Sequence, residues 1–185
     1  MIVLGIDPGT RHTGFGVIES LSRAERGASD KRETVIDYGT VSPSAKLDLM
    51  VRLQHIGEAV DALIAEHKPD ELAIEMPFMG KNAQAMLKLG QVQGFVMKAA
   101  LDREIPVTQY APREIKKAVV GNGNAKKEQV WFMLRAQLDL TEDRGLDASD
   151  ALAVALCHVH RVEAGPTGKF KDWKSFVAAN PDRVS

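Results

Sequence analysis

The sequence predicts an α/β fold, with a mixed five-stranded sheet and helices on both of its faces. Short apolar runs rich in β-branched residues alternate with longer segments whose apolar residues recur every three or four positions. The first three short runs follow one another directly, whereas each of the last two follows a helix-like segment. Because tight turns join antiparallel strands and helical crossovers join parallel ones, we expect three antiparallel strands first and parallel strands later.

Five segments have the pattern of strands. Ile2 to Asp7 is a short apolar run that ends in the turn sequence Pro8-Gly9, which is typical of a buried strand. A charged segment, Leu21 to Glu33, is predicted to be an exposed loop between the second and third strands. The remaining strands are expected at Thr13 to Ser20, Thr34 to Ser42, Glu71 to Glu75 and Pro106 to Tyr110.

Five further segments have helical periodicity. The first, Lys46 to His67, carries apolar residues at three- and four-residue steps, and a proline follows its end. Gly90 and Gly94 lie four apart on the second helix, where each costs about 1 kcal/mol relative to alanine, so we expect close helix contact there. The other helices are expected at Lys81 to Arg103, from Pro112, at Lys126 to Leu138 and at Asp147 to Val162.

The 185 residues are expected to form one domain over residues 1–163, followed by a poorly patterned tail over 164–185. A formal net charge of -1 argues mildly against nucleic-acid binding, although it does not exclude a local basic patch. The single cysteine, Cys157, excludes an intrachain disulfide. Because neither a signal peptide nor an apolar run of about 18 residues is present, we expect a cytoplasmic protein that makes no membrane contact.

Four acidic residues stand where chemistry is often found. Asp7 and Glu75 each end a predicted strand, and ligands of α/β sheets bind at the carboxyl ends of strands. Asp147 and Asp150 open the last helix three residues apart, so both lie on one face. Each also has an ordinary explanation, as a turn residue, an exposed strand end or a helix cap.

Taken together, the four acids predict a metal site. Clustered carboxylates repel one another, and oxygen ligands suit Mg²⁺ or Mn²⁺. Two such ions about 4 Å apart can activate a water molecule and stabilise the leaving oxygen in phosphodiester hydrolysis. Cys157, His158 and His160 lack the spacing of zinc ligands, so no zinc site is expected.

A local group of basic residues surrounds the predicted turn at 121–124. Lysines there can neutralise phosphates without raising the net charge of the chain much. The alternative is an ordinary solvated helix face. The group consists of Arg113, Lys116, Lys117, Lys126 and Lys127.

Five sequence blocks follow one another along the chain: Gly5 to Thr10 with Thr13 to Ile18, Ala73 to Glu75 with Phe78 to Asn82, Leu87 to Gln91, Val119 to Gly123, and Asp147 to Ala153. In this order and at this spacing, they resemble the RuvC family of bacterial Holliday-junction resolvases. The resemblance covers roughly Met1 to His160, and the order of elements is similar to the ribonuclease H-like arrangement. The charged loop from Leu21 and the tail from Gly165, which contains Trp173, depart from the family pattern.

The resemblance implies an endonuclease that resolves four-way DNA junctions by paired symmetric nicks. It implies a homodimer that works with the RuvA and RuvB branch-migration proteins, with the helix from Asn82 to Arg103 in the dimer interface. Two Mg²⁺ ions are implied in each active site, and Mn²⁺ is a substitute. Asp7, Glu75, Asp147 and Asp150 would be the catalytic metal ligands.

The resemblance also implies residues that contact DNA. Phe78 would stack on bases opened near the crossover, a contribution of roughly 1–3 kcal/mol per base. Lys116 and Lys127 match basic positions near the scissile phosphate, and Lys81 of the second block is a further candidate for DNA contact. The five-residue basic group described above would extend this surface.

Three other functions are considered. Another ribonuclease H-like nuclease, including one that cuts RNA–DNA hybrids, would share the fold and the acids. A non-catalytic junction-binding protein would need none of the four acids. An actin-like ATPase or sugar kinase would need a second similar half, for which 185 residues leave no room.

Overall fold

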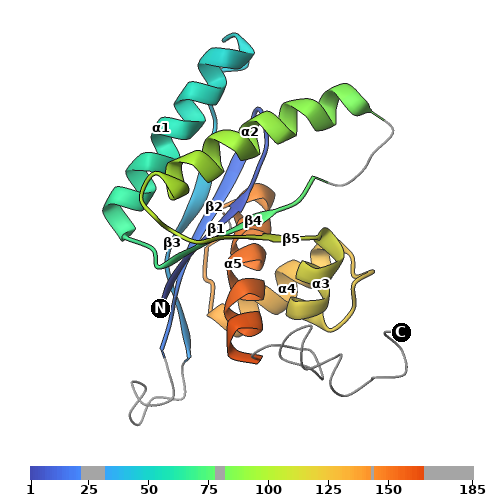
Figure 1. Cartoon of the computed structure of the whole chain (residues 1–185). Coiled ribbons are helices and arrows are strands. Elements are labelled where there is room, and N and C mark those ends of the chain that lie inside the picture. The colour runs from blue at the N-terminus through green and yellow to red at the C-terminus, as the bar shows by residue number, and fades with distance from the viewer. Residues whose placement is uncertain (22–31, 78–81, 143, 165–185) are drawn as a thin grey trace, which may run out of the picture.

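A computed structural model describes residues 1–21, 32–77, 82–142 and 144–164. Within them, one sheet has the strand order β3-β2-β1-β4-β5. β1 pairs antiparallel with β2, and β2 with β3, whereas β1 pairs parallel with β4, and β4 with β5 (Figure 1). The predicted mixed sheet is therefore confirmed. The strands are β1 (Ile2–Asp7), β2 (Thr13–Ser20), β3 (Glu33–Val41), β4 (Glu71–Glu75) and β5 (Val107–Tyr110).

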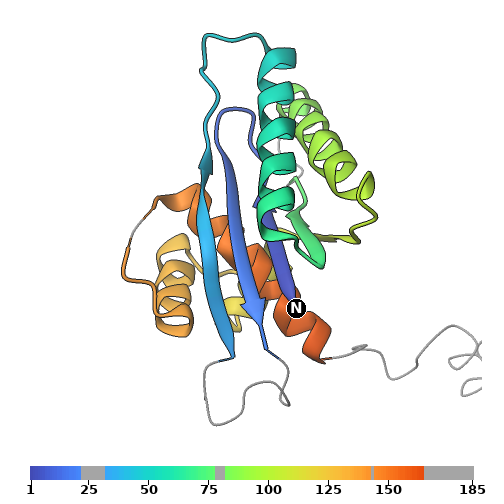
Figure 2. The same cartoon turned by 90° about the vertical axis from the view of Figure 1, so that its left-hand side faces the viewer.

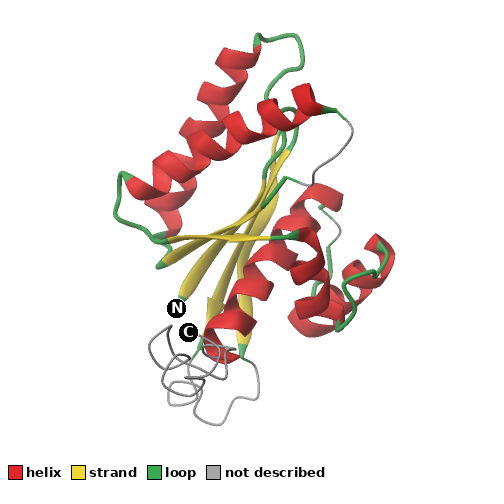
Figure 3. Ribbon diagram, turned by 45° about the vertical axis from the view of Figure 1, so that its right-hand side comes forward, coloured by secondary structure: helices red, strands yellow, loops and turns green. Residues whose placement is uncertain are grey.

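Helices cover both faces of the sheet, as predicted. The views in Figures 1, 2 and 3 show α1 and α2 on one face and α5, with α3 and α4 beside it, on the other. None of the helices in the described ranges combines the length and apolar character that a bilayer crossing requires. The helices are α1 (Leu49–His67), α2 (Ala83–Leu101), α3 (Pro112–Val120), α4 (Lys127–Leu138) and α5 (Leu146–Ala164).

Capping residues explain where the first two helices differ from the prediction. α1 begins at Leu49 and not at Lys46, because Asp48 caps it by accepting a hydrogen bond from the Leu49 amide. Asn82 caps α2 in the same way, with its side-chain oxygen 3.1 Å from the Ala85 nitrogen. Side-chain acceptors at these positions satisfy backbone donors that the first turn of a helix leaves unpaired.

Alternation along the strands decides which side chains face which helices. Leu4 and Ile6 of β1 lie in the core beneath α1 and α2, whereas Val3 lies in the core beneath α5. Successive side chains of a strand point to opposite faces, so Asp7 shares the α5 side with Val3. The same rule places Glu75 of β4 on the α5 side. Two acidic strand ends therefore face the helix that carries the other two acids.

α5 lies unusually close to the sheet because glycines line its path. A Cβ atom added to Gly5 would lie 2.4 Å from the backbone oxygen of Ala151, and one added to Gly14 would lie 1.9 Å from that of Asp147. Gly16, next but one along β2, likewise leaves no room for a side chain. Any larger residue at these positions would push α5 away from β1 and β2.

A buried histidine in the second half of α5 links this helix to β4 and β5. His158 is 1% exposed, and its two ring nitrogens lie 2.9 Å from the Tyr110 hydroxyl and 2.9 Å from a Glu71 carboxylate oxygen. Burial lowers the pKa of His158, and Glu71 opposes that shift. Both ring nitrogens are thus engaged in packing α5 against β4 and β5.

The close contact expected at Gly90 and Gly94 is wrong for the described part of the chain. A Cβ atom at either position would meet no atom within 4 Å. α1 and α2 approach each other instead at Gly57, where an added Cβ atom would lie 3.2 Å from the Phe95 ring. Gly90 and Gly94 are exposed, because the buried side of α2 is formed by other residues, Val92 and Val96 among them.

We expect Gly5→Ala to lower the free energy of unfolding by about 1–3 kcal/mol, because the new methyl group meets backbone atoms of α5 that cannot rotate away. Glu66→Ala, on the exposed side of α1, is the control. It adds no atom against the sheet and should change the free energy of unfolding by less than about 0.5 kcal/mol. Urea denaturation of both variants measures the difference, and equal effects would contradict the close packing.

Candidate active site

Three acids and two lysines line one cavity of about 160 Å³. Asp7 comes from β1, Glu75 from β4, Asp150 from α5, Lys116 from α3 and Lys127 from α4. Five elements that are far apart in the sequence thus converge at the carboxyl ends of β1 and β4. This is the edge of an α/β sheet at which ligands usually bind.

The turn after Asp7 is held by side chains from outside it. The Thr13 hydroxyl donates a hydrogen bond to the Gly9 carbonyl over 2.7 Å. The Arg52 guanidinium of α1 donates to the Thr10 carbonyl over 3.0 Å. These bonds hold the turn at Gly9 and Thr10, two and three residues beyond Asp7.

The backbone at Glu75 is held from both sides. Gln93 of α2, which is 7% exposed, donates a side-chain hydrogen bond to the Glu75 carbonyl over 2.8 Å. The next amide along the chain, Met76, donates to the Tyr110 carbonyl of β5 over 2.8 Å. Glu75 therefore ends β4 in a defined place and is not a frayed strand end.

The two acids of α5 differ in their surroundings. The helix begins at Leu146, so Asp147 is in its first turn. Asp150 forms an ion pair with Lys127, and its side chain is 21% exposed. Asp147 is not among the residues that line the cavity, although its charge raises the pKa of Asp7.

Burial and mutual repulsion hold protons on the strand-end acids. Burial first, and then the charges of Glu75, Asp150 and Asp147, raise the pKa of Asp7 from 3.8 to about 8, while Lys127 opposes the shift. Burial and Asp150 raise the pKa of Glu75 from 4.5 to about 7, against Lys127 and Lys116. A positive charge placed among these carboxylates would reverse both shifts.

The donor set suits a hard divalent cation, because it consists of carboxylate oxygens that are buried and repel one another. Although three acids line the cavity, no three acidic, histidine or cysteine side chains of the described residues lie close enough together to hold a metal ion as they are placed. Asp150 is paired with Lys127 instead. A cation shared with Asp7 would therefore have to take that carboxylate over from the lysine.

The structure separates the predicted basic residues. Lys116 and Lys127 line the acidic cavity, but Lys117 lines a different groove beside Arg161 on the other side of α3. Arg113 donates a hydrogen bond to the Asn124 side chain over 3.0 Å. Lys126 caps the start of α4. Phe78 and Lys81 lie outside the described residues.

Sequence reasoning missed the residues that hold this site together. Gln93 lies on α2 and Arg52 on α1, and the helical period of the apolar residues does not indicate a hydrogen-bond partner for either side chain. Gly5, Gly14 and Gly16 alternate with apolar residues on two paired strands. That alternation was a usable signal, because a glycine row on one face of a sheet indicates close approach of another backbone.

Comparisons with known proteins agree with this geometry. The family model described as "Crossover junction endodeoxyribonuclease RuvC" matches residues 3–158. A Salinibacter ruber protein described in the same words is 45% identical over 186 residues, which cover 100% of this chain and 99% of that protein.

Solved structures of resolvases have the same fold. Thermus thermophilus RuvC in complex with a Holliday junction substrate matches with a TM-score of 0.80 and 31% identity, over 89% of this chain and 96% of that chain. The yeast mitochondrial Holliday junction resolvase Ydc2 matches with a TM-score of 0.57 and 12% identity, over 85% of this chain and 78% of that chain, and shares the fold alone. The predicted ribonuclease H-like fold is confirmed.

The raised pKa values of Asp7 and Glu75 predict how stability depends on pH when a chelator keeps the protein free of metal. Between pH 3.8 and about 8 the folded state holds a proton on Asp7 that the unfolded state has lost, so stability falls as pH rises through this interval. Asp7→Asn should show a shallower fall, and Mg²⁺ should restore wild-type stability at pH 8. Thermal unfolding from pH 5 to 8 measures this, and identical slopes for the two proteins would contradict it.

Proposed function

The chain belongs to the RuvC family of crossover junction endodeoxyribonucleases, and from that premise we propose how its residues cut DNA. It is a hydrolase that resolves Holliday junctions by breaking phosphodiester bonds. The observation that carries the proposed site is the convergence of Asp7, Glu75 and Asp150 in one cavity with two lysines. We propose that the scissile phosphate binds at the mouth of this cavity.

The family is metal-dependent, and we propose that Asp7, Glu75, Asp147 and Asp150 hold two Mg²⁺ ions, for which Mn²⁺ can substitute. When bound, the cations polarise the phosphate and increase the acidity of the attacking water. The chain supplies the negative charge that attracts them. Burial and repulsion raise the pKa values of these carboxylates, which favours their protonated form. A bound cation would stabilise the charged form instead and would displace the protons.

We propose that the two cavity lysines bind the phosphate. Lys116 and Lys127 lower the pKa of Glu75, so their positive charges already act on the site. Lys127 pairs with Asp150, and with a cation held by that carboxylate its ammonium group would be free to bind the DNA backbone. Positive charge beside the scissile phosphate also stabilises the charge that develops during hydrolysis.

The buried acids argue against a non-catalytic junction-binding protein. Carboxylates beside a phosphate backbone repel it, so a protein that only binds DNA would gain nothing from keeping Asp7 and Glu75 buried there. A nuclease for RNA–DNA hybrids would use the same acids. Competition between a hybrid duplex and a four-way junction as substrates distinguishes the two nucleases.

We propose a homodimer formed through α2. Leu87 and Leu101 of this helix are 71% and 62% exposed, and Gly90 between them leaves room for a second backbone. A two-fold dimer matches the two related strands of a four-way junction, which accounts for paired symmetric nicks. Sedimentation velocity of the wild type tests the dimer, and a monomer mass at micromolar concentration would contradict it.

The remaining proposals follow from family membership. We propose that the protein works with the RuvA and RuvB branch-migration proteins in the cytoplasm. We also propose one nuclease domain over residues 1–163 and a separate tail over 164–185. Phe78 and Lys81 are proposed to contact DNA near the crossover. Resolution assays with and without the two partner proteins test the first of these proposals.

Asp7→Asn should bind a four-way junction as tightly as the wild type but cut it at least about a thousandfold more slowly. Loss of a metal ligand removes several kcal/mol of transition-state stabilisation. An end-labelled synthetic junction, with linear duplex as control, measures cleavage in Mg²⁺ and in Mn²⁺. Paired nicks that persist in the variant would remove Asp7 from the mechanism.

Lys116→Glu should reduce cleavage about tenfold or more, because charge reversal repels both the phosphate and the neighbouring acids. Lys117→Glu is the matched control, since its side chain lies one position along α3 but in a different groove. It should change cleavage far less. Equal losses in the two variants would show that overall surface charge, and not the cavity, determines the effect.

A further inference from the structure

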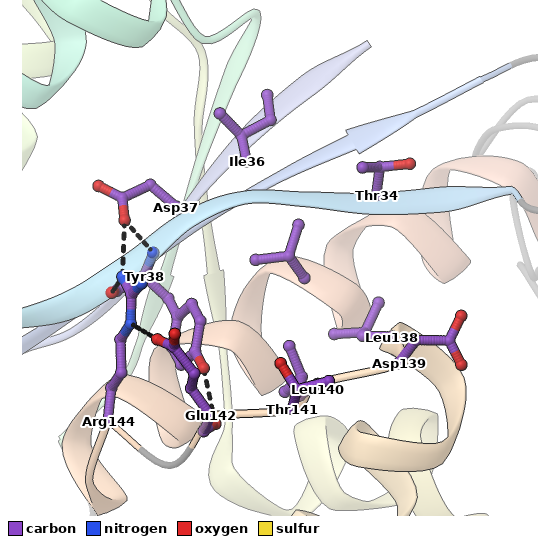
Figure 4. A pocket seen from close by; sticks show the side chains of 11 residues that line it. Thr34, Ile36, Asp37, Tyr38, Leu138, Asp139, Leu140, Thr141, Glu142 and Arg144 are labelled. Atoms are coloured by element: carbon purple, nitrogen blue, oxygen red, sulfur yellow. Dashed lines mark hydrogen bonds and ion pairs between the residues drawn. The ribbon is translucent and has the colours of Figure 1, made fainter.

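Arg144 lies at the centre of a group of contacts that ties the entry of α5 to the edge strand β3. Its Nε donates to the Glu142 carboxylate over 3.0 Å, and its Nη1 lies 3.2 Å from a carboxylate oxygen of Asp37 and 3.1 Å from the Tyr38 carbonyl. Figure 4 shows these side chains turned toward one another across a groove of about 300 Å³. A single guanidinium thus joins the α4–α5 connection to β3.

Tyr38 forms a second link between the same two segments. Tyr38 is 7% exposed, and the Arg144 guanidinium lies over its ring at 4.7 Å from the ring centre. Its hydroxyl donates to the Glu142 carbonyl over 2.7 Å. Because the phenol belongs to the α5-side core, this hydrogen bond anchors the connection to a rigid part of the fold.

These links come immediately before the acids of α5. Gly145 follows Arg144 with φ of 96°, a conformation that glycine adopts readily, and its carbonyl accepts the Ser149 amide at the start of the helix. Asp147 is three residues beyond Arg144. Only Gly145 separates Arg144 from the helix that carries Asp147 and Asp150. The position of Arg144 therefore determines the direction in which that helix begins.

We propose that Arg144 is a positioning residue for the cleavage site: by clamping Glu142 and its own backbone to β3, it fixes Asp147 and Asp150 relative to Asp7. This inference rests on the proposed function of those acids. Arg144 touches neither the cavity nor the substrate site, so it acts only through the helix that it orients.

The clamp differs from an ordinary surface ion pair in geometry. Exposed ion pairs contribute little to stability. The Arg144 guanidinium, however, contacts two carboxylates, a backbone carbonyl and an aromatic ring at the same time. Because the group is planar, the directions of its donors are fixed. Its main effect is therefore expected on the placement of the helix start and less on the stability of the whole chain.

The chain offers a matched control at the other end of the same helix. Arg32, just before β3, pairs with Glu163 near the end of α5. Arg32→Ala thus breaks the same kind of link between the edge-strand region and α5, but far from Asp147 and Asp150. Arg144→Ala and Tyr38→Phe break the two links at the catalytic end.

The experiment measures three properties of the full-length variants and the wild type. They are Mn²⁺ affinity by calorimetry without DNA, hydrogen exchange of the amides at 147–150, and single-turnover cleavage with junction binding measured separately in chelator. We expect Arg144→Ala to weaken Mn²⁺ affinity and slow cleavage by about tenfold each, with faster amide exchange and unchanged junction affinity. Arg144→Lys should recover only part of the Mn²⁺ affinity and of the cleavage rate. An ammonium group lacks the planar, forked arrangement of donors that a guanidinium has.

We expect Tyr38→Phe to have a smaller effect in the same direction and Arg32→Ala to match the wild type in Mn²⁺ affinity. If Arg144→Ala changes Mn²⁺ affinity and cleavage no more than Arg32→Ala does, the inference is overturned. Should Arg144→Ala not fold, wild-type Mn²⁺ affinity in folded Tyr38→Phe overturns it equally. A wild type that neither binds Mn²⁺ nor cuts junctions would overturn the proposed function, and the inference with it.

Discussion

The close seating of α5 on the glycines of β1 and β2 is the constraint on which the site depends. Gly5 and Gly14 let the helix backbone approach the sheet to a distance that no side chain would permit. Asp7 leaves the end of β1, and Asp150 leaves the first turns of the helix that lies against it. If α5 stood off the sheet by the width of a methyl group, Asp150 would no longer share a cavity with Asp7.

Stability elsewhere offsets the electrostatic cost of this arrangement. Burial and repulsion together raise the pKa values of Asp7 and Glu75, which means that the fold holds these carboxylates against an opposing force. Two apolar clusters, one on each face of the sheet, supply the compensating burial. The acids lie where the α5-side cluster opens to solvent, so their repulsion is concentrated at one end of a well-packed helix.

The sequence predicted the elements and the acidic site to the extent that local patterns determine them. Alternation and helical period located all the strands and helices in the described ranges, because each buries one face. The acids at strand ends were predictable for the same reason. Gly90 was misread because a glycine in a helix does not show whether its neighbour comes from this chain or another.

Side-chain partners from distant segments could not be predicted in this way. Lys116 and Lys117 are adjacent in the sequence, and only the packing of α3 decides which one faces the acids. Arg144 lies in a connection with no periodicity, and its partners on β3 are more than a hundred residues away. Such contacts follow from the tertiary fold, and local propensity carries no information about them.

The hydrogen bond from Gln93 to the Glu75 carbonyl has a consequence for communication across the molecule. The inner face of α2 holds the backbone of a cavity acid, while its outer face presents exposed leucines to solvent. The two faces are separated only by the diameter of a helix, about 10 Å. Any change in the tilt or position of α2 would therefore move the Gln93 amide and, with it, the hydrogen bond that holds the Glu75 carbonyl.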